Sequence, residues 1–412
     1  MRDYDRIAKK ITTVLFLSQS LSSAGFIAAF TVNALVGVDL TGWKAMAGVP
    51  GAVYVAGMAG GALVWGFSFE RFGCRWGLSL GQVVGVMGSA IAITGVVNRS
   101  IGFFLAGLLM VGMARSAVDL GRFIAAEVHP PEKRGRAISR VVLGSTVGAI
   151  AGPLLVGPTG QLATAAGFPE LAGPYGVGFA VLVIAAILIL RGLRPEPRDI
   201  ARELSQFHAQ ALPSQKTRSL SEVLRQPGVV VAMVTMAFAQ MAMVVPMSIT
   251  SVHMKTCHHP LTSVSLVISS HTFGMYAFSL LSGKMTDRWG RQPVIVLGAL
   301  VMMVSCVMAA PSVALLPLVA ALFLLGLGWN FAYVAGSTLL TDQLSPREKA
   351  KTQGFNDLVL NLSSAGSQLV SGLLYAVGGY GLMSLVAAGM AVVPLAAIVW
   401  WRSIRTANPS GR

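Results

Sequence analysis

The stretch GFSFERFGCR, from Gly66 to Arg75, returns later in the chain as GKMTDRWGRQ, from Gly283 to Gln292. In both stretches a glycine precedes an acid–arginine pair, and a second glycine and a basic residue come after it. The second stretch begins 217 positions after the first. The stretches EVHPPEKRGRAIS and DQLSPREKAKTQG recur at a similar distance. A fixed offset of this size indicates an internal duplication of about six helices.

The composition places these repeats in a membrane protein. Of the 412 residues 54% are hydrophobic and 11% are charged, and the mean hydropathy is +0.69, which a soluble protein of this size does not tolerate. Runs of about 20 apolar residues recur along the chain, each long enough to cross a hydrocarbon core of roughly 30 Å as a helix. We predict about twelve spans, near residues 11–37, 45–67, 78–98, 101–126, 139–160, 174–192, 228–250, 261–282, 293–310, 313–341, 354–378 and 381–401.

These spans predict an all-α membrane fold of two six-helix bundles. The first bundle covers residues 1–192 and the second covers residues 228–412. The polar stretch 193–227, rich in Arg, Pro, Ser and Gln, is the expected cytoplasmic linker.

The net charge of +15 is a topology signal. Lys and Arg cluster on alternate loops, and the opposite loops carry only Lys44, Arg99 and Lys255. This bias predicts that both termini are cytoplasmic. Anionic lipid of the inner leaflet is therefore the expected partner of the basic residues, and nucleic acid is not. Met1–Lys10 lead into a span too long for a signal peptide, so we expect that span to stay in the membrane.

Several charged residues are candidates for gating or structural roles. In ARSAVDLGR, Arg115 and Asp119 lie at positions i and i+4 and can neutralise each other in a medium that penalises a lone charge. Arg115 and Asp119 could form a purely structural ion pair or could serve in coupling or gating, and the sequence leaves both alternatives open. The full set is Glu70, Arg71, Arg115, Asp119, Arg122, Asp287, Arg288 and Arg291.

The stretch MAMVVPMSITSVHMKTCHHPLTSVSLVISSHTFGM, residues 241–275, carries candidate metal ligands. Met243 and Met247 are four apart on one predicted span, and His271 and Met275 are four apart on the next, so each pair shares a helix face. At about 1.5 Å per residue the four lie roughly 5 to 20 Å below the outer surface. Thioether sulfur with one imidazole suits Cu(I) and fits Zn²⁺, Mg²⁺ or Ca²⁺ poorly.

The loop between these two spans carries His253, Met254, Cys257, His258 and His259, which are candidates for metal entry. A solvated histidine-rich loop is the simpler interpretation of this segment. The simpler interpretation of the intramembrane methionines is flexible packing, since methionine is frequent in this chain, with 19 in all. What favours metal is the position of both pairs on adjacent spans, with a histidine near mid-membrane.

The chain resembles the major facilitator superfamily through the two copies of its GxxxDRxGR-type loop. The first copy departs from that pattern at Glu70 and Cys74. The stretch GAIAGPLLVG, residues 148–157, is similar to the GxxxGPxxG element of antiporters, and we interpret it mainly as helix packing. The order MxxxM then HxxxM also resembles the CcoA-type bacterial copper importers.

That narrower resemblance implies a copper importer of the bacterial inner membrane that supplies copper for haem-copper (cytochrome c) oxidase assembly. It makes Met243, Met247, His271 and Met275 the copper ligands. The copper ion is then the transported substrate, with no enzyme activity and no cofactor. We expect a monomer, with a copper chaperone as a candidate partner.

Two alternatives remain open. The first is a proton-coupled facilitator for an organic solute, either a drug exporter or a flavin-like importer, in which the methionines line an adaptable cavity. The second is a membrane metal sensor without transport, which the duplication disfavours. An ATP-driven copper pump is disfavoured because neither GxxxxGK[ST] nor CxxC occurs.

Overall fold

The computed structural model describes residues 4–130, 133–207 and 218–407, and all regular structure in these residues is helical. The predicted all-α fold is therefore confirmed. A helix satisfies its backbone N–H and C=O groups within one segment, which a chain this apolar requires in lipid. Part of the predicted linker, residues 208–217, lies outside the described residues.

The described residues include nine helices that are long and apolar enough to cross a membrane, or ten with the bent pair α10 (Leu261–Ala277) and α11 (Ser279–Trp289), whose axes differ by 41°. Two of the nine run over 54 residues, and each covers two of the predicted spans. Gly73, with φ of 83°, interrupts the first of these, and Gly379, with φ of 66°, interrupts the second. Counting unbroken helices thus gives fewer spans than the sequence predicts, and twelve stays a prediction.

The chain divides into two compact units, Met1–Pro213 and Ser214–Arg412. The division falls within the stretch 193–227 that we predict as a linker. That stretch contains two short helices, α7 (Pro197–Phe207) and α8 (Leu220–Leu224).

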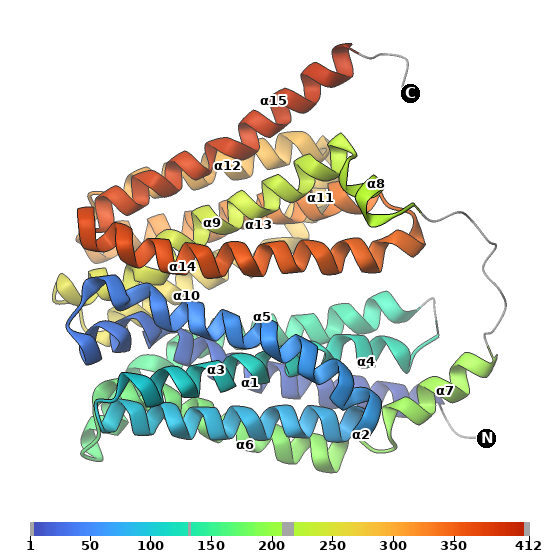
Figure 1. Ribbon diagram of the computed structural model, residues 1–412, viewed down its shortest axis with the longest axis horizontal. Helices are drawn as coiled ribbons and strands as arrows, with labels where there is room; N and C mark the ends of the chain where they lie inside the picture. Colours follow the sequence, from blue (N-terminus) through green and yellow to red (C-terminus); the bar gives the residue numbers. More distant parts are fainter. Residues whose placement is uncertain (1–3, 131–132, 208–217, 408–412) are drawn as a thin grey trace. The chain divides into compact units, whose positions relative to one another are not determined.

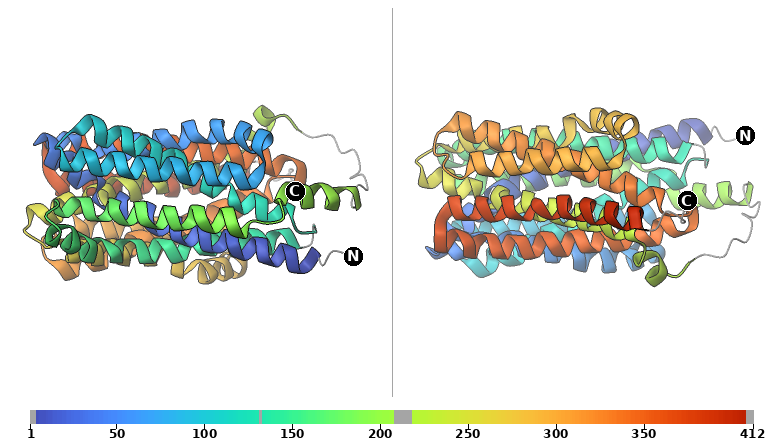
Figure 2. Two further views of the ribbon diagram at one scale, coloured as in Figure 1. Left: turned by 90° about the horizontal axis from the view of Figure 1, so that it is seen from below. Right: turned by 90° about the horizontal axis from the view of Figure 1, so that it is seen from above.

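In the first unit, α1 packs against α5 and α6, and α2 packs against α3 and α6 (Figures 1 and 2). A Cβ atom at Gly148 of α5 would lie 2.4 Å from the carbonyl oxygen of Ser20 on α1, so glycine is needed for this close approach. The stretch GAIAGPLLVG therefore serves helix packing. The elements are α1 (Tyr4–Thr41), η1 (Lys44–Gly48), α2 (Val49–Val97), α3 (Ile101–Asp119), α4 (Gly121–Glu127), α5 (Arg134–Ala165), η3 (Glu170–Ala172), α6 (Gly173–Gly192) and α7.

In the second unit, α13 packs against α9, α10 and α12, and α14 packs against α9. A core of buried aliphatic and aromatic side chains, among them Phe331 of α13 and Trp401 of α15, joins α9, α12, α13, α14 and α15. After α8 the elements are α9 (Pro227–Thr256), α10, α11, α12 (Arg291–Ala309), α13 (Leu315–Asp342), α14 (Pro346–Met390) and α15 (Val392–Ala407).

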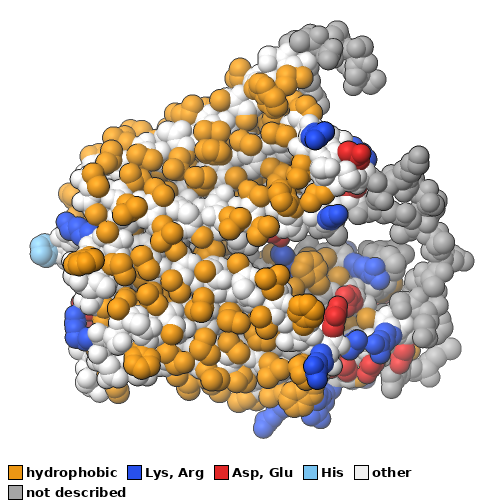
Figure 3. Space-filling view, in the orientation of Figure 1, with side chains coloured by type: hydrophobic (Ala, Val, Ile, Leu, Met, Phe, Trp, Pro, Cys, Tyr) orange, Lys and Arg blue, Asp and Glu red, His pale blue; other side chains and the backbone are white. Residues whose placement is uncertain are grey.

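The surface of each unit suits a lipid environment. Figure 3 shows hydrophobic side chains along the helices of each unit taken by itself, with most Lys, Arg, Asp and Glu side chains gathered toward one end of the helices. Large apolar side chains are widely exposed, for example Leu280 and Val377 at 84% each. In water such a surface would drive association, whereas against acyl chains it is the expected exterior.

Candidate functional site

The predicted metal ligands lie on α9 and α10, and three of the four are buried. His271 has no exposed surface, Met243 is 5% exposed and Met275 is 8% exposed, whereas Met247 is half-buried. Within each helix the two residues are one turn apart, as predicted. The helix packing brings α10 mainly against α13, so His271 has its closest polar contact there.

The hydrogen bond of His271 fixes the tautomer of its ring. Nδ1 lies 2.9 Å from the carbonyl oxygen of Leu322 on α13, and because a carbonyl only accepts, Nδ1 carries the proton. The neutral ring then presents a lone pair at Nε2. That atom is buried and has no hydrogen-bond partner among the described residues. An imidazole held in this way at one nitrogen, with the other nitrogen available, is the form that binds metals.

Two of the residues predicted for metal entry, His253 and His259, are held by backbone carbonyl groups. His253 Nε2 lies 2.9 Å from the carbonyl oxygen of Ser312, and His259 Nε2 lies 2.8 Å from that of Val313. The ring of His253 also stacks on Tyr380 at a centroid distance of 4.2 Å. Because α9 continues to Thr256, His253 lies in its last turn and not in the predicted loop. The two hydrogen bonds tie the end of α9 and the connection after it to the connection before α13, and the stacking ties α9 to α14.

Few side chains of the segment from His253 to His259 lie close enough together to bind one metal ion. The Cys257 sulfur lies 3.9 and 4.0 Å from the ring nitrogens of His253, Met254 is fully buried, and His258 is exposed with φ of 61°. Among the described residues no group of three or more His, Cys, Asp or Glu side chains could hold a metal ion. The structure therefore brings His253 and Cys257 together and favours a packing role for the segment.

The first unit contains a polar cluster around the predicted ion pair. Arg115 Nε lies 3.0 Å from Asp119 Oδ2, and their side chains are 18% and 31% exposed. Gln19 of α1 donates to Asp119 Oδ1 at 3.2 Å and to the hydroxyl of Ser145 on α5 at 2.7 Å. The guanidinium group also lies 5.7 Å from the centre of the Phe26 ring. The i,i+4 spacing predicted the pair, whereas the contribution of Gln19 was not predicted.

The second unit contains an amide–aromatic cluster that the sequence interpretation missed. Trp329 Nε1 of α13 donates to Gln240 Oε1 of α9 at 2.9 Å, and Gln240 Nε2 donates to the hydroxyl of Ser364 on α14 at 2.8 Å. The rings of Trp329 and Tyr333 stack with centroids 4.8 Å apart. Stacked aromatic faces beside an amide and a hydroxyl are suited to a planar organic molecule with polar edges. The sequence signal was a glutamine inside a span and two aromatic residues four positions apart.

The charged loops of the two copies make different contacts. In the second copy Arg291 Nε lies 2.8 Å from Asp342 Oδ2, which ties the start of α12 to the end of α13. In the first copy the carbonyl of Glu70 accepts a hydrogen bond from Arg198 of α7 at 2.7 Å. Arg71 and Arg122 lie over the rings of the phenylalanines that follow them, at 5.7 and 4.8 Å. Asp287 and Arg288 lie at the end of α11.

The family model described as Major Facilitator Superfamily matches residues 15–256 and 235–412. The chain belongs to the major facilitator superfamily. A superfamily member of Bacillus subtilis, described as the uncharacterized MFS-type transporter YdeG, is 33% identical over 396 residues, which is 96% of this chain and 92% of that protein. Both the family and this relative are described as transporters, so this facilitator is a membrane transporter and not an enzyme.

Two further likenesses extend over nearly the whole facilitator. The riboflavin transporter RfnT of Brucella anthropi is 28% identical over 404 residues, covering 98% of this chain and 97% of that protein. A bacterial homologue of the human lysosomal transporter Spinster, solved in an inward-facing conformation, is 18% identical and covers 98% of this chain and 96% of its own, with a TM-score of 0.67. The second likeness supports the fold alone.

Proposed function

We propose that this facilitator carries a planar organic solute of the flavin type across the bacterial inner membrane by alternating access. The observation that carries the proposal is the amide–aromatic cluster of Gln240, Trp329, Tyr333 and Ser364. Its π faces and polar groups match the chemistry of such a solute. The full-length likeness to a riboflavin transporter supports the same choice.

The orientation in the membrane is part of this proposal. Lys and Arg are frequent in the loops that we place in the cytoplasm, whereas the opposite loops carry Lys44, Arg99 and Lys255. This bias supports our proposal that both termini lie in the cytoplasm, since inner loops are enriched in Lys and Arg.

Uptake of radiolabelled riboflavin by cells that express the facilitator tests the solute. Trp329→Leu and Gln240→Leu each remove one partner of the cluster, and we expect about tenfold slower uptake at matched protein levels. Trp400→Leu is the matched control, because Trp400 is 46% exposed on α15 and lies outside the cluster. Equal uptake by the native protein, both cluster variants and cells that lack the protein would exclude riboflavin.

Copper import is the second candidate. It is favoured by the buried Nε2 of His271, which has no hydrogen-bond partner in the part of the chain that the structure describes, with Met275 one turn along the same helix. Neutral soft donors give moderate affinity for Cu(I), which a carrier needs in order to release the ion. On this candidate the transporter supplies copper for haem-copper oxidase assembly, and a copper chaperone is its expected partner.

Uptake of radioactive copper distinguishes the two candidates. If copper is the substrate, His271→Ala and Met243→Ala lose uptake, whereas Met302→Ala, which truncates a buried methionine of α12, retains it. Trp329→Leu tests the opposite case. It impairs riboflavin uptake if the organic solute is the substrate, and it leaves copper uptake unchanged if copper is the substrate. Accumulation inside proteoliposomes would also exclude a sensor that binds metal without transport.

A further inference from the structure

The two copies of the duplicated loop end in the same backbone conformation. Gly73 has φ 83° and ψ 172°, and Gly290 has φ 89° and ψ 168°. In each copy helical geometry resumes at the next residue. The first backbone N–H groups of such a stretch have no partner within the helix, and they favour a negatively charged group.

In the first copy a carboxylate occupies this position. Glu196 Oε1 accepts hydrogen bonds from the backbone N–H of Cys74 at 2.6 Å and of Arg75 at 3.2 Å. The same oxygen is the nearest atom to a Cβ built on Gly73, at 3.0 Å. The first copy therefore binds an anion, supplied by the segment that precedes α7.

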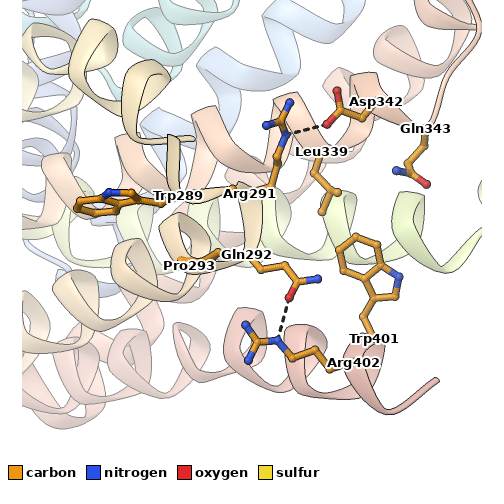
Figure 4. A pocket seen from close by; sticks show the side chains of 10 residues that line it. Trp289, Arg291, Gln292, Pro293, Leu339, Asp342, Gln343, Trp401 and Arg402 are labelled. Atoms are coloured by element: carbon orange, nitrogen blue, oxygen red, sulfur yellow. Dashed lines mark hydrogen bonds and ion pairs between the residues drawn. The ribbon is translucent and has the colours of Figure 1, made fainter. Parts of the chain in front are cut away.

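In the second copy the same position is open. Among the described residues a Cβ atom built on Gly290 would meet nothing within 4 Å, and Gly290 itself has no side chain that could cap the first turn of α12. A cavity of about 430 Å³ lies here (Figure 4). Its lining consists of Trp289, Gly290, Arg291, Gln292, Pro293, Leu339, Asp342, Gln343, Trp401 and Arg402.

The charges of the lining favour an anion. The lining contains two positively charged guanidinium groups, of Arg291 and Arg402, and one negatively charged carboxylate, of Asp342. Figure 4 shows Arg291 directed at Asp342 and Arg402 directed at Gln292. Each contact is made through Nε at 2.8 Å, and Nη1 of Arg291 also donates to the carbonyl of Thr286 at 3.2 Å. An arginine whose Nε is already held presents its guanidinium in a fixed orientation, which suits the geometry of a phosphate group.

We propose that this pocket binds the phosphate group of an anionic phospholipid of the inner leaflet. α12 and the segment Lys351–Ile404, at whose end Trp401 and Arg402 lie, are apolar enough to cross the membrane, so their charged ends meet the headgroup region. Two tryptophans in the lining match the preference of that side chain for the membrane interface. Inorganic phosphate has the same chemistry and is the alternative source. The proposal does not depend on the transported solute.

Native mass spectrometry of the full-length protein in detergent tests the pocket. The protein is titrated with phosphatidylglycerol, with phosphatidylcholine, whose choline cancels the phosphate charge, and with inorganic phosphate. Arg402→Gln removes one cation, and Gln292→Glu places a carboxylate inside the pocket. Arg225→Gln is the matched control, because Arg225 is an exposed arginine of the same unit outside the pocket.

We expect phosphatidylglycerol to bind about fivefold more weakly to Arg402→Gln and to Gln292→Glu, and equally well to Arg225→Gln and the native protein. Binding that is equal in all four proteins, or equal for the two lipids, would overturn the proposal. Displacement of phosphatidylglycerol by inorganic phosphate at the same concentration would overturn the lipid as the source. Gln292→Glu keeps an acceptor for Arg402, so it reports on the pocket even if Arg402→Gln fails to fold.

Discussion

At the scale of single residues, the ion pair of Arg115 and Asp119 makes a prediction about stability. Asp119→Asn removes the carboxylate from a guanidinium that is only 18% exposed, and we expect a loss of about 1–3 kcal/mol in the free energy of unfolding. The double variant Arg115→Gln/Asp119→Asn should recover at least half of the free energy of unfolding that Asp119→Asn loses, because it leaves no unpaired guanidinium charge. Titration with a denaturing detergent measures both losses.

The first unit offers a matched control for this pair. Arg99 and Asp39 also form an ion pair, at 3.5 Å, but their side chains are 65% and 51% exposed. Asp39→Asn should therefore cost less than about 1 kcal/mol. Equal losses for Asp119→Asn and Asp39→Asn would mean that burial does not set the strength of the Arg115 pair.

The same residues show what can be predicted from sequence at this scale. The Arg115–Asp119 contact follows from a spacing of four on one helix, so it could be predicted. Gln19 and Asp119 are 100 positions apart in the sequence, and His271 and Leu322 are 51 positions apart. No local sequence pattern encodes contacts between residues so far apart. For that reason the Trp329–Gln240 contact was missed as well.

At the scale of elements, the packing of α10 on α13 depends on Gly326. A Cβ atom at this position would lie 2.2 Å from the carbonyl oxygen of His271, so Gly326→Ala must push the two helices apart. We predict a loss of about 1–3 kcal/mol in stability, from overpacking. A thermal unfolding scan in detergent, with Gly283→Ala as the control, measures it.

Gly283 lies within α11, and a Cβ atom there would meet no atom of the described residues within 4 Å. Gly283→Ala should therefore leave stability unchanged or raise it by up to about 1 kcal/mol, because alanine favours the helix. A Gly326→Ala protein as stable as Gly283→Ala would show that α10 and α13 do not approach this closely.

The contact between α1 and the segment after α4 predicts a pH dependence. Thr12 Oγ1 donates to the Ala8 carbonyl, so it accepts from Nε2–H of His129 at 2.9 Å. Nδ1 of His129 is buried with no hydrogen-bond partner among the described residues, so a proton added there would have no acceptor. Burial, and then the charge of Lys133, lower the pKa of His129, while Asp5 opposes them.

Because the folded protein holds this histidine neutral, its contribution to stability is present above the ordinary pKa of 6.5 and is lost as the pH falls through the lowered value. The thermal midpoint should therefore fall further between about pH 7.5 and about pH 5 in the native protein than in His129→Gln. Parallel decreases in the two proteins would assign the acid sensitivity to other groups.

The helices themselves could be predicted well because hydropathy is a local property. The predicted spans 174–192 and 293–310 correspond to α6, Gly173–Gly192, and α12, Arg291–Ala309. What could not be predicted is where helical geometry continues through a polar loop. The loop near Gly73 stays helical except at that glycine, because the anionic side chain that caps the next turn comes from Glu196, more than 120 positions away.

At the scale of the whole molecule, the duplication explains why one loop motif supports two different contacts. The glycine conformation is encoded in the repeat and recurs at Gly73 and Gly290. The residue that binds the backbone N–H groups after the glycine lies outside the repeat. In the first unit it is Glu196, whereas in the second unit the corresponding position is a pocket lined by Arg291 and Arg402. A repeat therefore predicts backbone geometry more securely than it predicts partners.

The orientation of the molecule can be tested with its three native cysteines. Cys257 is half-buried after α9, on the side that we predict to face outward, whereas Cys74 and Cys306 are 8% and 0% exposed. A membrane-impermeant maleimide should therefore label intact spheroplasts at Cys257, and Cys257→Ser should abolish that label. Burial protects the other two thiols from either side, so their weak reaction carries no information on orientation. If label appears at Cys257 only after the membrane is opened, both termini face outward and the distribution of Lys and Arg has been misinterpreted.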